Sequence, residues 1–149
     1  MSEMKTIQYE NRKDFGPGPW NDESDKANWI DEETGLDCMI VRNPEMGNLC
    51  GYVGIPLNSK LIKLDCNDIE VNIHGGLTYT GRCGGDICHE AEEEVYWLGF
   101  DCAHYLDITP GMNSIPSFNY PFDKNLTYKD FNYVKSEVES LAKQLKALL

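Results

Sequence analysis

The sequence predicts an α+β fold, in which an antiparallel sheet of four to six strands carries a C-terminal amphipathic helix packed on it. Short β-rich segments follow one another along most of the chain, whereas a helical period appears in the last segment alone. No alternation of strands and helices, which a parallel sheet requires, is present. The length of 149 residues fits a single domain over 1–149, and 41% hydrophobic residues exclude a disordered chain.

Several segments have the composition of β-strands. Two of them flank a turn that contains Pro44 and Gly47, so we expect them to form a hairpin. The segment before His74 alternates apolar and polar residues, as a half-buried strand does. A Gly-Gly break separates it from the next strand, and an aromatic-rich run forms the last one. The expected strands are 37–42, 49–55, 69–73, 77–80 and 95–100, and 28–31 is either a first strand or a single turn.

The clearest element is a helix over about 127–148. Apolar residues recur at steps of three and four from Phe131 to Leu148, which gives one apolar stripe. Thr127 is the expected N-cap, and Asp130 three residues later completes a capping box. We expect the stripe to pack on the body of the domain; pairing of two such helices in a homo-oligomer is the alternative.

Two features predict where the protein works. Neither a signal peptide nor an apolar run long enough to span a membrane is recognisable in the sequence. Six cysteines are an even number, as three disulfides in a secreted protein would need, but without an export signal we expect reduced thiols. The prediction is a cytoplasmic protein with no membrane partner.

The chain is strongly acidic, with 25 acidic and 13 basic residues and a formal net charge of −12. Most of the negative charge lies in residues 1–37 and 60–107, and a solvated surface that keeps the protein soluble is the simplest interpretation. Such a surface repels phosphate chains and therefore excludes an extended nucleic-acid groove. It does not exclude a small pocket.

Two histidines are the candidate acid–base groups. In the segment 99–107, a helical turn would place Asp101, His104 and Asp107 on one face, whereas a strand would pair Cys102 with His104. In both cases a carboxylate near His104 would orient its ring and raise its basicity. His74 is the second histidine, and a Cys102 nucleophile is a variant. The catalytic candidates are therefore His74, His104, Asp101 and Asp107.

Residues around the Gly-Gly break and in two other loops are candidates for ligand binding. Glycines beside a histidine let backbone N–H groups approach an anion, hydroxyls follow them, and a tryptophan after Gly-Pro-Gly-Pro offers a stacking surface. Arginines would neutralise a phosphate. For the tryptophan, the alternative is that it is buried and holds an ordered loop in place. For the histidine, the alternative is a purely structural role. The ligand-binding candidates are Trp20, Arg42, Gly75, Gly76, Thr78, Tyr79 and Arg82.

A metal site is a further hypothesis, although no cofactor is certain. Cys83 and Cys88 flank a glycine-containing loop, and Cys102 with His104 would complete a tetrahedral zinc site. The spacing is longer than in common zinc ribbons, so a Cys83–Cys88 disulfide or unrelated buried thiols are alternatives. Another divalent metal bound by His74, Asp101 and His104 is a second arrangement.

Four motifs together resemble an uncharacterised family spread through phage and bacterial genomes. They are Gly-Pro-Gly-Pro-Trp at 16–20, Cys-Gly-Tyr-Val-Gly at 50–54, His-Gly-Gly-Leu-Thr-Tyr at 74–79, and Trp-Leu-Gly-Phe-Asp-Cys-Ala-His at 97–104. The resemblance extends from Gly16 to the terminal helix and implies no catalytic role. Its phage association implies an anti-defence protein that handles a host nucleotide signal.

Three functional hypotheses follow. The first is a protein that binds a small nucleotide-like or phosphorylated molecule. The second is a hydrolase, of the phosphodiesterase class, that uses His74 and His104 with Asp101 or Asp107, with or without a metal. The third is an acidic module that binds another protein.

Overall fold

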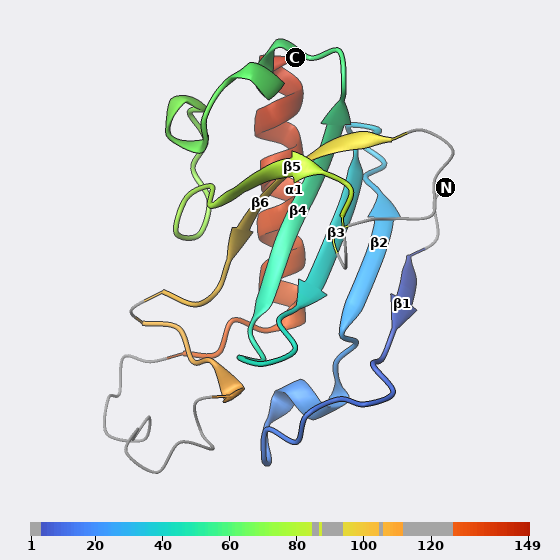
Figure 1. Cartoon of the computed structure of the whole chain (residues 1–149), viewed down its shortest axis with the longest axis vertical. Coiled ribbons are helices and arrows are strands. Elements are labelled where there is room, and N and C mark those ends of the chain that lie inside the picture. Colours follow the sequence, from blue (N-terminus) through green and yellow to red (C-terminus); the bar gives the residue numbers. More distant parts are fainter. Residues whose placement is uncertain (1–3, 85–86, 88–93, 105, 112–126) are drawn as a thin grey trace.

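A computed structural model describes residues 4–84, 87, 94–104, 106–111 and 127–149. Its strands form one antiparallel sheet in the order β1-β2-β3-β4-β6-β5, and the helix α1 packs along β3 and β4 on one face (Figure 1). This confirms the predicted α+β fold with its C-terminal helix. The strands are β1 (Lys5–Ile7), β2 (Lys26–Ile30), β3 (Asp37–Arg42), β4 (Leu49–Pro56), β5 (Tyr79–Arg82) and β6 (Val95–Asp101); α1 is Phe131–Leu148. Short 3₁₀ helices are η1 (Pro19–Asp22), η2 (Lys60–Lys63) and η3 (Cys66–Asp68).

The two strands on either side of the Asn43–Asn48 turn form the predicted hairpin. Asp37 pairs with Gly54 and Arg42 with Leu49, so β3 and β4 are aligned over the whole of β3. Of the segment 28–31, for which a strand and a turn are the alternatives, residues 28–30 belong to strand β2, and Asp31 follows the strand. β1 had no clear signal, because its three residues are all exposed and show no apolar alternation.

The face of the sheet toward α1 holds the larger hydrophobic core. Side chains such as Ile40, Val53 and Leu98 pack there against the buried stripe of the helix. A Cβ on Gly51 would lie 2.6 Å from Val138 and from Phe100, so glycine lets α1 lie close to β4 at this point. The helix is thus held by burial of apolar surface, which contributes roughly 25 cal/mol per Å².

The opposite face carries a second, smaller cluster around Met39, Val41, Tyr52 and Trp97. In Figure 1, β5 crosses in front of β4, and the Tyr79 ring of β5 meets the Tyr52 ring of β4 edge-on at 5.6 Å. The sheet therefore curls, so that β5 lies over the face opposite to α1. This curl places the end of β6 and the start of β5 beside the turn after β3.

The prediction of a strand over 69–73 is wrong. Ile69 and Ile73 are buried toward α1, as the alternation indicates, but the segment pairs with no strand among the described residues. Its backbone bonds instead to helix side chains: Asn72 exchanges two hydrogen bonds with the Gln144 amide, at 2.7 and 2.9 Å. Alternation reports which side chains are buried, and it does not report which partner satisfies the backbone. The following strand, β5, begins two residues later than expected.

The helix begins later than predicted. Asp130, rather than Thr127, is the N-cap, because its carboxylate accepts a hydrogen bond from the Tyr133 N–H at 2.8 Å. Thr127 instead pairs with the backbone of Leu106 and Ile108. The segment 109–123, which contains three prolines and shows no helical or strand period, lies mostly outside the described residues. In the described part of the chain, no helix is long and apolar enough to cross a membrane.

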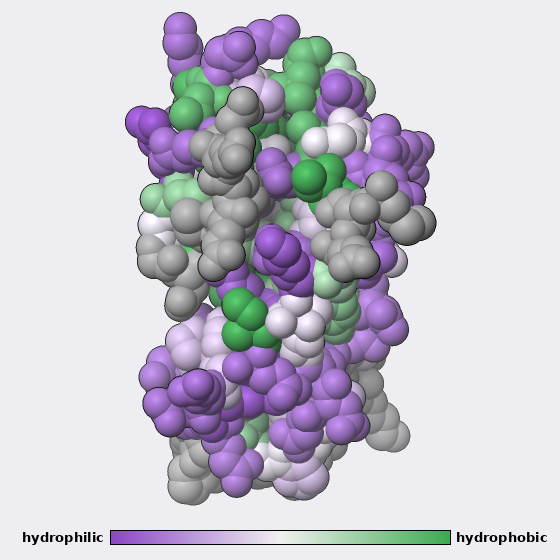
Figure 2. All heavy atoms as spheres, turned by 90° about the vertical axis from the view of Figure 1, so that its right-hand side faces the viewer, coloured by the Kyte–Doolittle hydropathy of each residue, from purple (hydrophilic) through white to green (hydrophobic). Residues whose placement is uncertain are grey.

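The surface is mainly hydrophilic on the side of the edge strand β1, where hydrophobic residues form only small separate patches (Figure 2). The five cysteines that the structure describes have free thiols, and Cys88 lies outside the described residues.

Candidate functional site

The four candidate catalytic residues come together beside the end of β6. The rings of His74 and His104 lie edge to face with their centroids 5.7 Å apart. Each ring has its own carboxylate: His74 Nε2 lies 2.7 Å from Asp107, and His104 Nε2 lies 3.3 Å from Asp101. His74 comes from the turn before β5, and the other three come from the end of β6 and the loop after it. The structure therefore makes one cluster from two motifs far apart in the sequence.

Asp107 is the buried centre of this cluster, and 1% of its side chain is exposed. Its Oδ2 accepts from His74 Nε2 and from the His104 backbone N–H at 3.0 Å, while Lys129 Nζ lies 3.2 Å from Oδ1. Burial by itself would raise the pKa of Asp107, but the hydrogen bonds from His74 and the His104 backbone outweigh it and lower the pKa. Asp107 is thus an ionised carboxylate that holds both histidines in position.

A chain of hydrogen bonds runs from Asp107 through His74 to the surface. His74 Nδ1 lies 2.9 Å from the Tyr133 hydroxyl, whose residue is 38% exposed. Because Nε2–H donates to the carboxylate, Nδ1 of a neutral ring accepts from Tyr133, and Nδ1–H of a charged ring donates to it. Burial and the nearby Glu137 raise the pKa of Tyr133, so its hydroxyl keeps its proton at neutral pH.

Sequence reasoning missed two members of the cluster, Tyr133 and Lys129. Tyr133 lies on the first turn of α1 off the apolar stripe, where a tyrosine has the pattern of an ordinary surface residue. Lys129 lies just before the helix, with its ammonium 5.8 Å from the centre of the Tyr133 ring. The sequence contains no signal for either role, because both depend on how α1 docks.

Of the two glycines after His74, Gly75 has a packing role that the sequence did not predict. Gly75 has φ +69°, and a Cβ there would overlap the His104 imidazole, so glycine lets that ring pack on the turn. Gly76 has φ +77° but faces open space. The backbone N–H of His74 donates to Glu137 and that of Gly76 donates to Ile73, so neither of these two N–H groups is free to bind an anion. These two amides make no anion-binding turn.

Asp101 connects the histidines to a cleft of about 410 Å³. Its carboxylate accepts from the Thr78 hydroxyl at 3.0 Å and from the Ala103 N–H at 3.1 Å. The walls include Asn48, Cys50, Tyr52, Thr78 and Tyr79. Burial raises the pKa of Cys50 to about 11, so this wall thiol is neutral. The cleft brings two of the ligand-binding candidates, Thr78 and Tyr79, next to the catalytic candidates.

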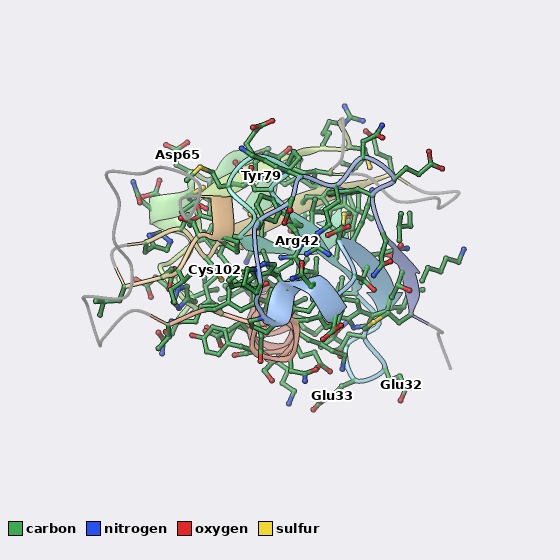
Figure 3. The ribbon with its side chains drawn as sticks, turned by 90° about the horizontal axis from the view of Figure 1, so that it is seen from below. Glu32, Glu33, Arg42, Asp65, Tyr79 and Cys102 are labelled. Carbon is green, nitrogen blue, oxygen red and sulfur yellow. The ribbon has the colours of Figure 1, made fainter. Side chains whose placement is uncertain are left out.

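Arg42 and Trp20 do not lie at a ligand surface, which corrects the prediction for both. Arg42 is fully buried and bonds to Asp25 at 2.8 Å and to Glu23 at 3.0 Å, in the middle of the molecule seen from below (Figure 3). Trp20 is also buried, with its Nε1–H donating to Gly16 at 3.1 Å. The alternative of a loop pinned by a buried tryptophan therefore holds. Arg82 is exposed on β5 and pairs with Glu94 at 2.7 Å.

The proposed zinc ligands do not come together. Cys102 is buried on the side of the sheet toward α1, whereas Cys83 packs in the cluster on the opposite side, which also holds Tyr79 (Figure 3). The Cys83 thiol accepts from Trp97 Nε1–H at 3.3 Å, and Cys88 lies outside the described residues. Burial raises the pKa of Cys102 far above neutrality, so it is no thiolate nucleophile. No three metal-ligating side chains gather around one point in the described ranges, which also removes the arrangement with His74, Asp101 and His104.

No family model, curated protein or solved structure matches this chain. The functional argument therefore depends on the geometry of the cluster and its cleft.

Proposed function

We propose that the protein binds a small nucleotide-like phosphoester in the cleft beside Asp101 and hydrolyses it by acid–base catalysis. The observation that carries the proposal is the pair of partly exposed imidazoles, 5.7 Å apart, each beside its own carboxylate. Phosphodiester hydrolysis requires one group to accept a proton from the attacking water and another to donate one to the leaving oxygen. Two histidines held in different environments can divide these tasks.

His104 is the proposed general base. Its Nε2 faces Asp101, which would stabilise the imidazolium that forms when Nδ1 takes a proton from the attacking water. Its side chain is 37% exposed, so the ring is within reach of a bound substrate. The hydroxyl of the activated water forms the new P–O bond in this step.

His74 and Tyr133 are the proposed general acid, acting as a relay. With His74 protonated, the Tyr133 hydroxyl gives its proton to the leaving oxygen as the old P–O bond breaks, and Nδ1–H of His74 replaces that proton. Asp107 accepts from Nε2–H of His74 throughout. Solvent then removes one proton from His104 and returns one to His74. Lys129 supplies positive charge beside Asp107.

Turnover of a chromogenic phosphodiester and a panel of cyclic nucleotides by the purified protein tests this function. We expect His104→Gln and Tyr133→Phe each to lower kcat by about 10²–10⁴, the usual contribution of a positioned acid or base. Tyr96→Phe, on β6 but outside the cluster, is the matched control and should retain activity. If the unaltered protein turns over none of these esters, the hydrolase proposal fails.

A second surface favours the third hypothesis, a module that binds a basic protein. A groove of about 450 Å³ between β2 and α1 combines Trp29, Ile30 and Lys135 with the carboxylates of Asp31, Glu32, Glu33 and Glu139. Glu139 pairs with Lys135 and Glu33 with Lys143, so four carboxylates face two lysines. Glu32 and Glu33 point away from the body of the molecule (Figure 3). Titration of a lysine-rich amphipathic peptide tests it: Glu32→Lys with Glu33→Lys should abolish binding that the unaltered protein shows.

A further inference from the structure

We propose that the cleft beside Asp101 recognises a guanine-type heterocycle through two neighbouring N–H donors on its edge. This inference rests on the proposed function, because it names the part of the nucleotide-like substrate that the cleft would hold. It concerns the base alone and leaves the phosphate to the histidine cluster.

The chemistry of the cleft walls favours a hydrogen-bond donor over an anion. The described residues that line it include the Asp101 carboxylate and the Asn48 amide but no lysine or arginine. A phosphate placed there would lose its hydration without gaining a positive partner, which is costly. A ligand edge rich in N–H groups would instead meet acceptors.

Asp101 can accept further hydrogen bonds from such N–H groups. Its carboxylate accepts from Thr78 and Ala103 and lies 3.3 Å from His104 Nε2 without a hydrogen bond to it, yet 34% of the side chain is exposed. An ionised carboxylate offers about four lone-pair positions, so acceptor sites remain on it. Its two oxygens match two adjacent N–H donors, such as the ring N–H and the exocyclic amino group of guanine, and both bonds would be charge-assisted.

Asn48 provides a second acceptor in the wall. The residue is 2% exposed, and its Oδ1 has no hydrogen-bond partner among the described residues. A buried acceptor without a partner costs free energy, and a rotation of the Asn48 side chain toward the cleft would let a ligand N–H recover it. This observation is independent of Asp101 and indicates the same kind of ligand.

Tyr79 gives the cleft an aromatic wall. It lies half-buried on β5 and edge-on to the buried Tyr52, at an interplanar angle of 89°. A Cβ on Gly81 would lie 2.8 Å from the Tyr79 hydroxyl, so glycine lets the ring lie along β5. Aromatic side chains bind nucleobases by stacking, and a cleft of about 410 Å³ is of the usual size for a small ligand.

Calorimetric titration with nucleosides, which lack phosphate, tests base recognition separately from catalysis. We expect guanosine to bind, inosine to bind about 10–100-fold more weakly because it lacks the exocyclic amino group, and adenosine not to bind measurably. If guanosine does not bind, or if 1-methylguanosine or free guanidinium binds equally well, the inference is overturned.

The Asp101→Asn variant tests the role of the carboxylate. An amide offers one acceptor and one donor, so guanosine should bind about 10–100-fold more weakly while xanthosine, with an oxygen in place of the amino group, gains affinity. Asp65→Asn, an exposed residue outside the cleft, removes the same charge and should bind guanosine normally. Unchanged guanosine affinity in Asp101→Asn would overturn the inference.

The two proposals fail separately. Ester turnover without nucleoside binding would overturn the guanine inference and leave the hydrolase. Guanosine binding without turnover of any ester would overturn the hydrolase and leave the recognition of the base.

Discussion

Two clusters of charged residues in this protein each have a buried aspartate at the centre, but they differ in how far their outer residues are exposed to solvent. The cluster around Arg42 is centred on the fully buried Asp25, which binds Arg42 at 2.8 Å, Arg12 at 3.3 Å and the Tyr9 N–H at 2.8 Å. The cluster around His74 is centred on Asp107. Both clusters include a tyrosine from the start of the C-terminal segment, Tyr128 in the first and Tyr133 in the second.

The two clusters differ in what lies at their edges. The guanidinium of Arg42 donates to side chains and carbonyls on every side and has no exposed surface, so that cluster joins the N-terminal loop to the rest of the fold. In the second cluster the central carboxylate of Asp107 is buried, but the rings of His104 and Tyr133 at its edge are partly exposed to solvent. A closed cluster stabilises the fold, whereas an open one holds titratable groups at the surface, where the proposed substrate would meet them.

The sharpest way to break this comparison is Arg42→Met. Removing the guanidinium leaves the fully buried Asp25 and the partly buried Glu23 with fewer positive partners, which should lower the free energy of unfolding by about 3–5 kcal/mol. Urea denaturation measures it. Arg82→Met, which removes an exposed pair, is the control and should cost less than about 1 kcal/mol. Equal, small effects would mean that the Arg42 cluster is not structural.

Replacing each glycine after His74 by alanine sharpens the description of the open cluster. Both have positive φ, so Gly76→Ala should cost about 1 kcal/mol through backbone strain alone. Gly75→Ala adds an overlap with the His104 ring and should cost about 2–4 kcal/mol. Thermal unfolding measures both, and the NMR signals of the His104 ring should move only in Gly75→Ala. Matching results for the two variants would show that Gly75 does not position His104.

A smaller effect than that of Arg42 or Gly75 is expected for the pH dependence that Asp107 contributes. Its pKa is lower in the folded protein than its ordinary value, so its stabilisation is fully present above the unfolded pKa of about 3.9 and is lost as the pH falls through the folded pKa. At neutral pH, Asp107→Asn should cost about 1.5 kcal/mol, and the difference from the unaltered protein should shrink below about pH 4.

Urea titrations at several pH values measure this difference. Glu45→Gln, at an exposed carboxylate, should show little change at any pH. A gap between Asp107→Asn and the unaltered protein that widens as the pH falls would contradict the assigned role of Asp107.

The sequence predicted the elements whose signals are local. The stripe from Phe131 to Leu148 identified α1, and the turn between two apolar runs identified the β3–β4 hairpin. The prediction for 69–73 is wrong because the backbone of Asn72 bonds to Gln144, on the helix, rather than to a strand. Alternation of apolar and polar residues indicates which side chains are buried, but it does not indicate which group bonds to the backbone.

The same division applies to the candidate site. Asp101, His104 and Asp107 were predicted from their spacing, and His74 from its glycines, and the structure places all four together. Arg42 and Trp20 have side chains that suit a ligand, yet they are buried, since spacing does not report burial.

The sequence by itself determined the α+β class, the terminal helix, the strands next to clear turns, and the residue types able to do acid–base chemistry. Only the tertiary structure decided which charged residues are closed into the interior and which stay open. That decision depends on the curl of the sheet and the docking of α1, which bring together residues 59 positions apart such as His74 and Tyr133. Whether a side chain is buried, and which group it contacts, depends on both of the surfaces that pack together. Periodicity in one segment describes only one of these two surfaces.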